Sequence, residues 1–157
     1  MPHFNPADAS PLLICAVTII LAAAGGLLPF SPIEPVLLVT AIARPSLLVP
    51  VVALATISQM SAKALLFLGS QKAQARLSDR KRGAIERVRV RLEGRRRLQI
   101  FTVLLSAMAG LPPLYVVTLV CGALRVRLSD YLIAGSIGRA ARFSALVMLP
   151  QLFAAVR

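Results

Sequence analysis

Long apolar runs fill most of this chain, and the basic residues gather in the gaps between them. Of the 157 residues, 57% are hydrophobic, and the mean hydropathy is +0.78. A soluble domain of this length does not need so much apolar surface for its core, so the surplus must face lipid. The sequence therefore predicts an all-α integral membrane protein with a single membrane domain over residues 1–157.

The distribution of charge predicts how the chain is oriented. The formal net charge is +12, and eleven of the eighteen Lys and Arg residues lie between Lys72 and Arg97. Because cytoplasmic loops carry an excess of Lys and Arg, we expect the segment 70–97 to be a cytoplasmic loop on the membrane surface. A nucleic-acid partner is not expected, since Trp is absent and no aromatic residue interrupts this basic segment.

Three stretches have enough apolar residues to cross a bilayer. A spanning helix needs about 17 to 25 such residues. The expected spans are residues 12–28, which are at the lower limit of length, 47–69 and 131–153.

Two further stretches are too short or too broken to cross. Residues 29–45 hold an apolar run of only eight residues between prolines, and residues 98–124 are interrupted in the middle by Gly and Pro. Irregular backbone is tolerated at membrane depth only inside protein or beside a wet cavity, so both stretches are expected to be re-entrant hairpins. The expected turn residues are Pro29 and Pro32 in the first hairpin, and Gly110, Pro112 and Pro113 in the second.

The order of these segments predicts an inverted repeat. A shift of 79 residues places Ala43 on Gly122 and Lys63 on Arg142, and brings the two proline-bearing turns close together. The fold class is thus about three transmembrane helices plus two re-entrant helical hairpins that enter from opposite faces. Such repeats with broken helices are typical of secondary transporters.

A few ionisable side chains lie within the apolar segments and are the candidate site residues. Arg142 is nearest the middle of its span, and Arg139 lies on the same helical face, so the two guanidinium groups could hold a phosphate. Glu34 could be their resting counter-charge, and Lys63 a further cation. Two alternatives stay open: a purely structural ion pair, and a Lys63 side chain that reaches the cytoplasmic headgroups.

Other chemistry finds no support in the residues. Cys15 and Cys121 lie in apolar runs without paired spacing, and His3 is the sole histidine. We expect no disulfide, no metal site, no cofactor and no catalytic residues, and therefore no enzyme.

Several short motifs in order and spacing resemble the DedA family, also called the SNARE-associated Golgi or VTT-domain proteins, and its small YqaA-like bacterial members in particular. The resemblance covers about residues 27–149. Its motifs are Pro29-Phe-Ser-Pro-Ile-Glu34, Gln59-Met-Ser-Ala-Lys63, Phe67-Leu-Gly69, Gly110-Leu-Pro-Pro-Leu-Tyr115, Gly122-Ala-Leu-Arg125 and Gly138-Arg-Ala-Ala-Arg-Phe143.

This resemblance implies a multi-pass protein of the bacterial plasma (inner) membrane that moves lipids between leaflets. It implies anionic phospholipid or undecaprenyl phosphate as the partner, and it matches Glu34 to the acidic residue of the family's first hairpin. The chain departs from the family at Ala62, where many members carry an acidic residue, and in Leu111–Val120, which lacks the family's arginines.

The leading hypothesis is therefore a lipid translocase or scramblase in which a phosphate-bearing headgroup meets Arg142 and Arg139. A small ion-coupled solute transporter and a non-transporting membrane scaffold are the alternatives. The sequence leaves open whether the chain forms a homo-oligomer.

Overall fold

The computed structural model describes residues 10–28, 33–73, 83, 85–87, 90 and 94–155, with side chains as far as residue 148. Helices make up this part of the chain, which contains no strand, so the all-α prediction is confirmed. The elements are α1 (Pro11–Leu27), α2 (Ile33–Ala43), a short 3-10 turn η1 (Pro45–Leu47), α3 (Leu48–Ala73), α5 (Arg96–Ala109), α6 (Leu114–Ala123) and α7 (Leu128–Ala155).

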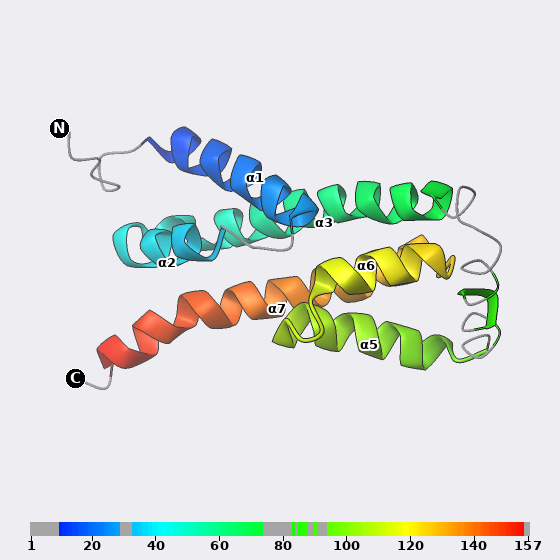
Figure 1. Ribbon diagram of the computed structural model, residues 1–157. Helices are drawn as coiled ribbons and strands as arrows, with labels where there is room; N and C mark the ends of the chain where they lie inside the picture. Colours follow the sequence, from blue (N-terminus) through cyan, green and yellow to red (C-terminus); the bar gives the residue numbers. More distant parts are fainter. Residues whose placement is uncertain are drawn as a thin grey trace.

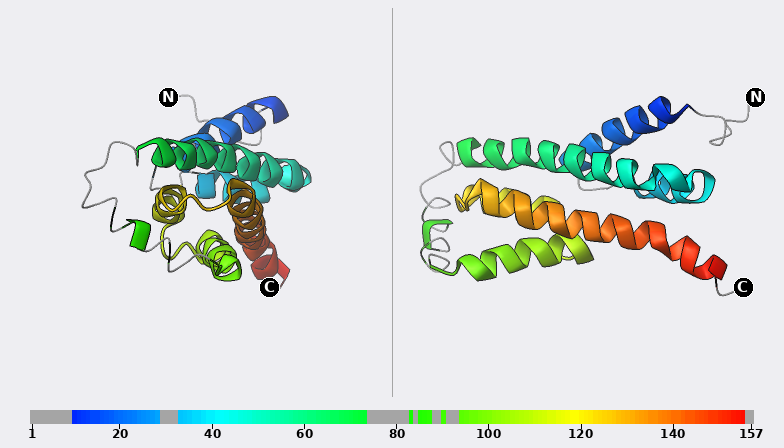
Figure 2. Two further views of the ribbon diagram at one scale, coloured as in Figure 1. Left: turned by 90° about the vertical axis from the view of Figure 1, so that its right-hand side faces the viewer. Right: turned by 180° about the vertical axis from the view of Figure 1, so that it is seen from behind.

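The helices form two halves, and in each half a helix of medium length is followed by a shorter helix and then by the longest one. Each half has a helical hairpin, α1 with α2 or α5 with α6, followed by a long helix, α3 or α7. Figures 1 and 2 show that the two hairpins enter the molecule from opposite ends, and that α1 ends and α6 begins near its middle. The long helices run through the whole length of the molecule beside them.

The first half differs from the sequence-based expectation in where its chain reverses. Residues 12–28 were expected to cross, yet α1 ends beside the middle of α3, where a Cβ on Gly26 would lie 2.6 Å from Cβ of Ala62. The hairpin therefore consists of α1 and α2, and the stretch 29–45 supplies only its second arm. A run at the lower limit of spanning length cannot by itself distinguish a crossing from a half-crossing. The expected turn residues Pro29 and Pro32 lie outside the described residues.

In the second half, the stretch 98–124 holds two helices, α5 and α6. Gly110, Pro112 and Pro113 lie between them. Gly110 ends α5 in the left-handed conformation, with φ of +79°, and its N–H donates to the Ser106 carbonyl. Glycine suits this position because it has no Cβ and therefore adopts the left-handed conformation without a steric clash.

The two halves are joined by crossed packing. The first arm of each hairpin packs on the long helix of its own half, α1 on α3 and α5 on α7, while the second arm packs on the other half, α2 on α7 and α6 on α3. The long helices α3 and α7 also contact each other. Each hairpin therefore contacts both halves of the molecule.

The interior contains two apolar clusters. One lies among α3, α5, α6 and α7, where the rings of Phe67 and Tyr131 stack with centroids 5.1 Å apart. The other joins α1, α2, α3 and α7 and contains Leu37 and Phe143. Between them the interior holds charged and polar side chains.

Some charged side chains are buried, whereas many large apolar side chains are exposed. Lys63 is 1% exposed and Arg139 is 7% exposed, while Leu12, Val49 and Ile42 are 82%, 81% and 72% exposed. In the described part of the chain, the stretch Pro45–Ala73 is long and apolar enough to cross a membrane. A surface with many large exposed aliphatic side chains is typical of a site that contacts a membrane or another protein.

Candidate functional site

The four site residues predicted from sequence come from both halves. Lys63 lies near the midpoint of α3, Arg139 and Arg142 near the midpoint of α7, and Glu34 in the first turn of α2. The end of α1 and the turn between α5 and α6 reach this level of the molecule (Figure 1). The site is therefore built where the ends of the short helices meet the middles of the long ones.

Lys63 contacts the end of α1. Its Nζ donates to the Gly26 carbonyl at 3.2 Å, and the side chain is 1% exposed. The last carbonyls of a helix have no partner within the helix and carry its partial negative charge, so a cation stabilises them. The alternative in which Lys63 reaches the membrane surface is therefore wrong.

Arg142 occupies the equivalent place against the second hairpin. Its guanidinium lies so close to Gly110 that a Cβ there would collide with Nη1. Its Nη2 donates to Oε1 of Glu34 at 2.7 Å, and the two side chains are 26% and 29% exposed. Glu34 also lies at the N-terminus of α2, where the helix dipole favours a negative charge.

Arg139 lies one turn before Arg142 and is more deeply buried. Its Cζ lies 5.9 Å from the ring centroid of Phe143, and its Nε has no hydrogen-bond partner. It interacts electrostatically with Arg142, Glu34 and Lys63. A buried donor without a partner costs free energy, so Arg139 is the least satisfied cation of the group.

The charges of this cluster do not balance. Lys63, Arg139 and Arg142 face a single carboxylate, Glu34, because the other acidic residue in α1, α2, α3, α5, α6 and α7 is Asp130, which pairs with Arg96. Like charges this close repel each other where water is scarce. A bound anion with two charged oxygens, such as a phosphate, would neutralise the surplus and match the forked guanidinium groups.

The turn of the second hairpin satisfies much of its own backbone. Ser106 Oγ donates to the Pro112 carbonyl at 2.6 Å, the Pro113 carbonyl accepts from two N–H groups of α6, and the two prolines have no N–H to pair. The N-terminus of α6 has no acidic residue in its first turn and no side-chain cap. This helix end thus differs from that of α2, which carries Glu34.

A second ion pair lies away from the cluster and escaped the sequence-based reasoning. Arg96 at the start of α5 donates twice to Asp130 at the start of α7, both at 2.6 Å. These hydrogen bonds hold the pKa of the Asp130 carboxyl below its usual value. Only the isolation of Asp130 in an apolar and basic context could have indicated this pair from sequence.

Gly26 and Ser106 were also missed. The adjacent glycines Gly25 and Gly26 were the available signal for a close helix contact at the end of α1, whereas nothing in the sequence singles out Ser106.

No group of three His, Cys, Asp or Glu side chains gathers within the described ranges, so these residues offer no metal-binding cluster. The arrangement can instead bind an anion through guanidinium and ammonium groups. Comparison of the chain with protein-family models, with curated proteins and with solved structures gave no match, so the resemblance to DedA proteins stays a prediction.

Proposed function

We propose that this chain is a multi-pass protein of the bacterial plasma membrane that moves an anionic, phosphate-bearing lipid between leaflets. The apolar exterior of α1, α3 and α7 supports a position within lipid. The basic segment 70–97 would then be cytoplasmic by the positive-inside rule. In this arrangement α3 and α7 cross the bilayer, and the two hairpins enter it from opposite faces without crossing.

One observation carries the proposal: three buried or half-buried cations and a single carboxylate lie among the end of α1, the start of α2 and the end of α5. Keeping this surplus of charge away from water is costly, and the cost is recovered when an anion binds. A cluster that only held the helices together would be more stable with equal numbers of positive and negative charges.

The geometry suggests how a headgroup would move. A lipid phosphate competes with Glu34 for Arg142 and reaches Arg139 behind it, while the chains of the lipid stay in hydrocarbon. Because one hairpin opens toward each end of the molecule, small motions of one half against the other could expose the site to either side in turn. The resemblance to DedA proteins supports the same reading, with a phospholipid or undecaprenyl phosphate as cargo.

The proposal is tested by lipid transfer in reconstituted vesicles. Arg142→Gln should slow the transfer of a fluorescent anionic phospholipid about tenfold or more, because a hydrogen bond to a charged group contributes roughly 1.5 to 3 kcal/mol. Transfer of undecaprenyl phosphate should fall in parallel if that lipid is cargo. Unchanged transfer of both lipids in the Arg142→Gln protein would overturn the proposal.

The paired variant Glu34→Gln with Arg142→Gln controls for folding, since it removes both members of the ion pair. It should be folded and still inactive if Arg142 binds the headgroup. Uptake of inorganic phosphate in the same vesicles without lipid transfer would favour a solute transporter, and a folded wild-type protein without flux of either kind would favour a scaffold.

A further inference from the structure

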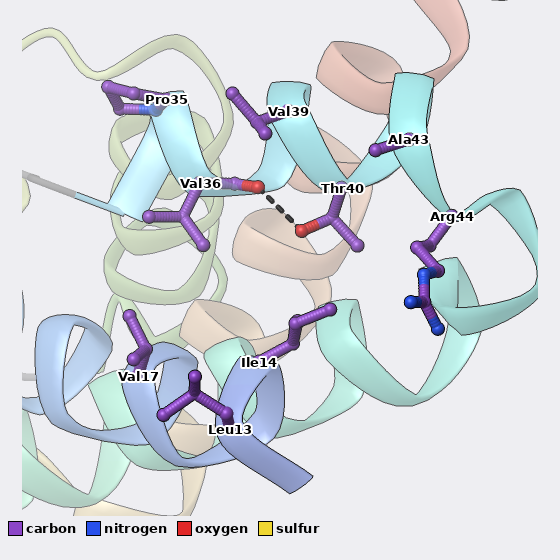
Figure 3. A pocket seen from close by; sticks show the side chains of 9 residues that line it. All are labelled: Leu13, Ile14, Val17, Pro35, Val36, Val39, Thr40, Ala43 and Arg44. Atoms are coloured by element: carbon purple, nitrogen blue, oxygen red, sulfur yellow. Dashed lines mark hydrogen bonds between the residues drawn. The ribbon is translucent and has the colours of Figure 1, made fainter. Parts of the chain in front are cut away.

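The two arms of the first hairpin enclose an apolar groove. Its cavity volume is about 350 Å³, and its walls come from α1 through Leu13, Ile14 and Val17, and from α2 through Val36, Val39 and Thr40. Figure 3 shows Val36 and Thr40 on the side of α2 that faces the α1 side chains. The groove follows from the crossed packing, because α1 is held by α3 and α2 by α7, so the arms spread apart.

The groove offers hydrocarbon contacts along its length and a charge at its end. Thr40 is the one hydroxyl in its lining, and that hydroxyl already donates to the Val36 carbonyl at 2.7 Å. Arg44 is the one charged lining residue, and it stands just past the end of α2 (Figure 3). An apolar channel with a guanidinium at its mouth is complementary to an anionic amphiphile.

The position of the groove relates it to the central site. Its lining runs from Pro35, next to Glu34 of the ion pair, to Arg44 at the end of the molecule away from the basic segment. The helix between these two residues rises about 14 Å at 1.5 Å per residue. A chain in this groove would therefore extend from the outer end of the molecule to the level of the charged cluster.

We propose that this groove holds one hydrocarbon chain of an anionic lipid whose phosphate is bound by Arg44. The proposal rests on the proposed function for the chemistry of the lipid, and it assigns Arg44 as the entry site on the face opposite the basic segment. The guanidinium holds the phosphate at the mouth, and the chain occupies the groove before the headgroup moves toward Arg142.

Quenching by brominated lipids tests this proposal, because the chain has no Trp of its own. A Trp placed in the groove by Val39→Trp should be quenched more strongly by brominated phosphatidylglycerol than by brominated phosphatidylcholine at equal mole fraction. The preference should disappear when Arg44→Gln is added, and inorganic phosphate should not reduce it. The matched control Ile42→Trp lies on the same helix, is 72% exposed and does not line the groove, so it should show no preference.

Equal quenching of the groove Trp by the two lipids, or a preference that survives Arg44→Gln, would overturn the proposal. The readout is independent of transfer at Arg142. A lipid preference at Val39→Trp together with unchanged transfer in the Arg142→Gln protein would support the groove and reject the translocation proposal. Equal quenching at Val39→Trp together with slowed transfer in the Arg142→Gln protein would reject the groove and support translocation.

Discussion

The two halves of the molecule share their helix order but differ in the charges that they bring to the centre. In the first half, the ammonium of Lys63 is held by the Gly26 carbonyl, and Glu34 begins α2. In the second half, Arg139 and Arg142 lie on α7, and the N-terminus of α6 has no carboxylate. A repeat of backbone structure has thus produced one asymmetric site, in which one half supplies the counter-charge for the cations of the other.

The ion pair between the halves should give the largest effect when it is broken. Glu34→Gln leaves Arg142 without its carboxylate in a place poor in water. Breaking a fully buried pair costs about 3 to 5 kcal/mol; because both partners are about a quarter exposed, we expect a loss of roughly 1 to 3 kcal/mol in the free energy of unfolding. Thermal unfolding in a mild detergent measures it.

The double variant of Glu34 and Arg142 sharpens this comparison. Removal of both charges should restore most of the lost stability, since no uncompensated charge from the pair is left. A double variant as unstable as Glu34→Gln alone would show that Glu34 stabilises α2 by other means.

The next largest loss of stability is expected from a substitution where α6 packs on α3. A Cβ on Gly122 would meet the backbone carbonyl of Phe67 and the Ser70 side chain, and the carbonyl cannot move aside. Gly122→Ala should therefore lower the free energy of unfolding by about 1 to 3 kcal/mol through overpacking.

Gly69 on α3 provides the matched control, because nothing lies within 4 Å of a Cβ placed there. Gly69→Ala should raise the stability by about 0.5 to 1 kcal/mol, since alanine favours a helix more than glycine does. If the two substitutions shift the unfolding temperature in the same direction, the close contact between α6 and α3 is refuted.

The ion pair at the base of the second half should give the smallest effect, because Arg96 is 60% exposed. The lowered pKa of Asp130 means that the pair stabilises the folded state above about pH 4, and that this contribution is lost as the pH falls through the native pKa. Asp130→Asn should unfold at a lower temperature than wild type at pH 7, and the difference should vanish toward pH 2. A difference that is constant with pH would contradict this origin.

The sequence predicted the helical class and the residues of the charged cluster, because both rest on local signals. Apolar runs indicate helices, and Arg142 stood out because a charge far from either end of an apolar run is costly. The pairing of α1 with α2 was not predicted, since a run of 17 residues satisfies the length of a short crossing and of a long hairpin arm equally well.

What the sequence could not supply were contacts between distant residues. The bond from Lys63 to Gly26 and the pair of Arg96 with Asp130 join positions 37 and 34 residues apart. Such contacts depend on which helices lie side by side, and the crossed arrangement of the second arms follows from side-chain fit across both halves and not from any periodicity along the chain.

That crossed arrangement constrains how the protein is made. When the first half leaves the ribosome, α2 can contact α1 and α3 but lacks its contacts with α7, because α7 is synthesised after it. The contacts of α3 are likewise incomplete until α6 has been synthesised. The first hairpin therefore completes its packing, and Glu34 acquires its partner Arg142, only after α7 has been made.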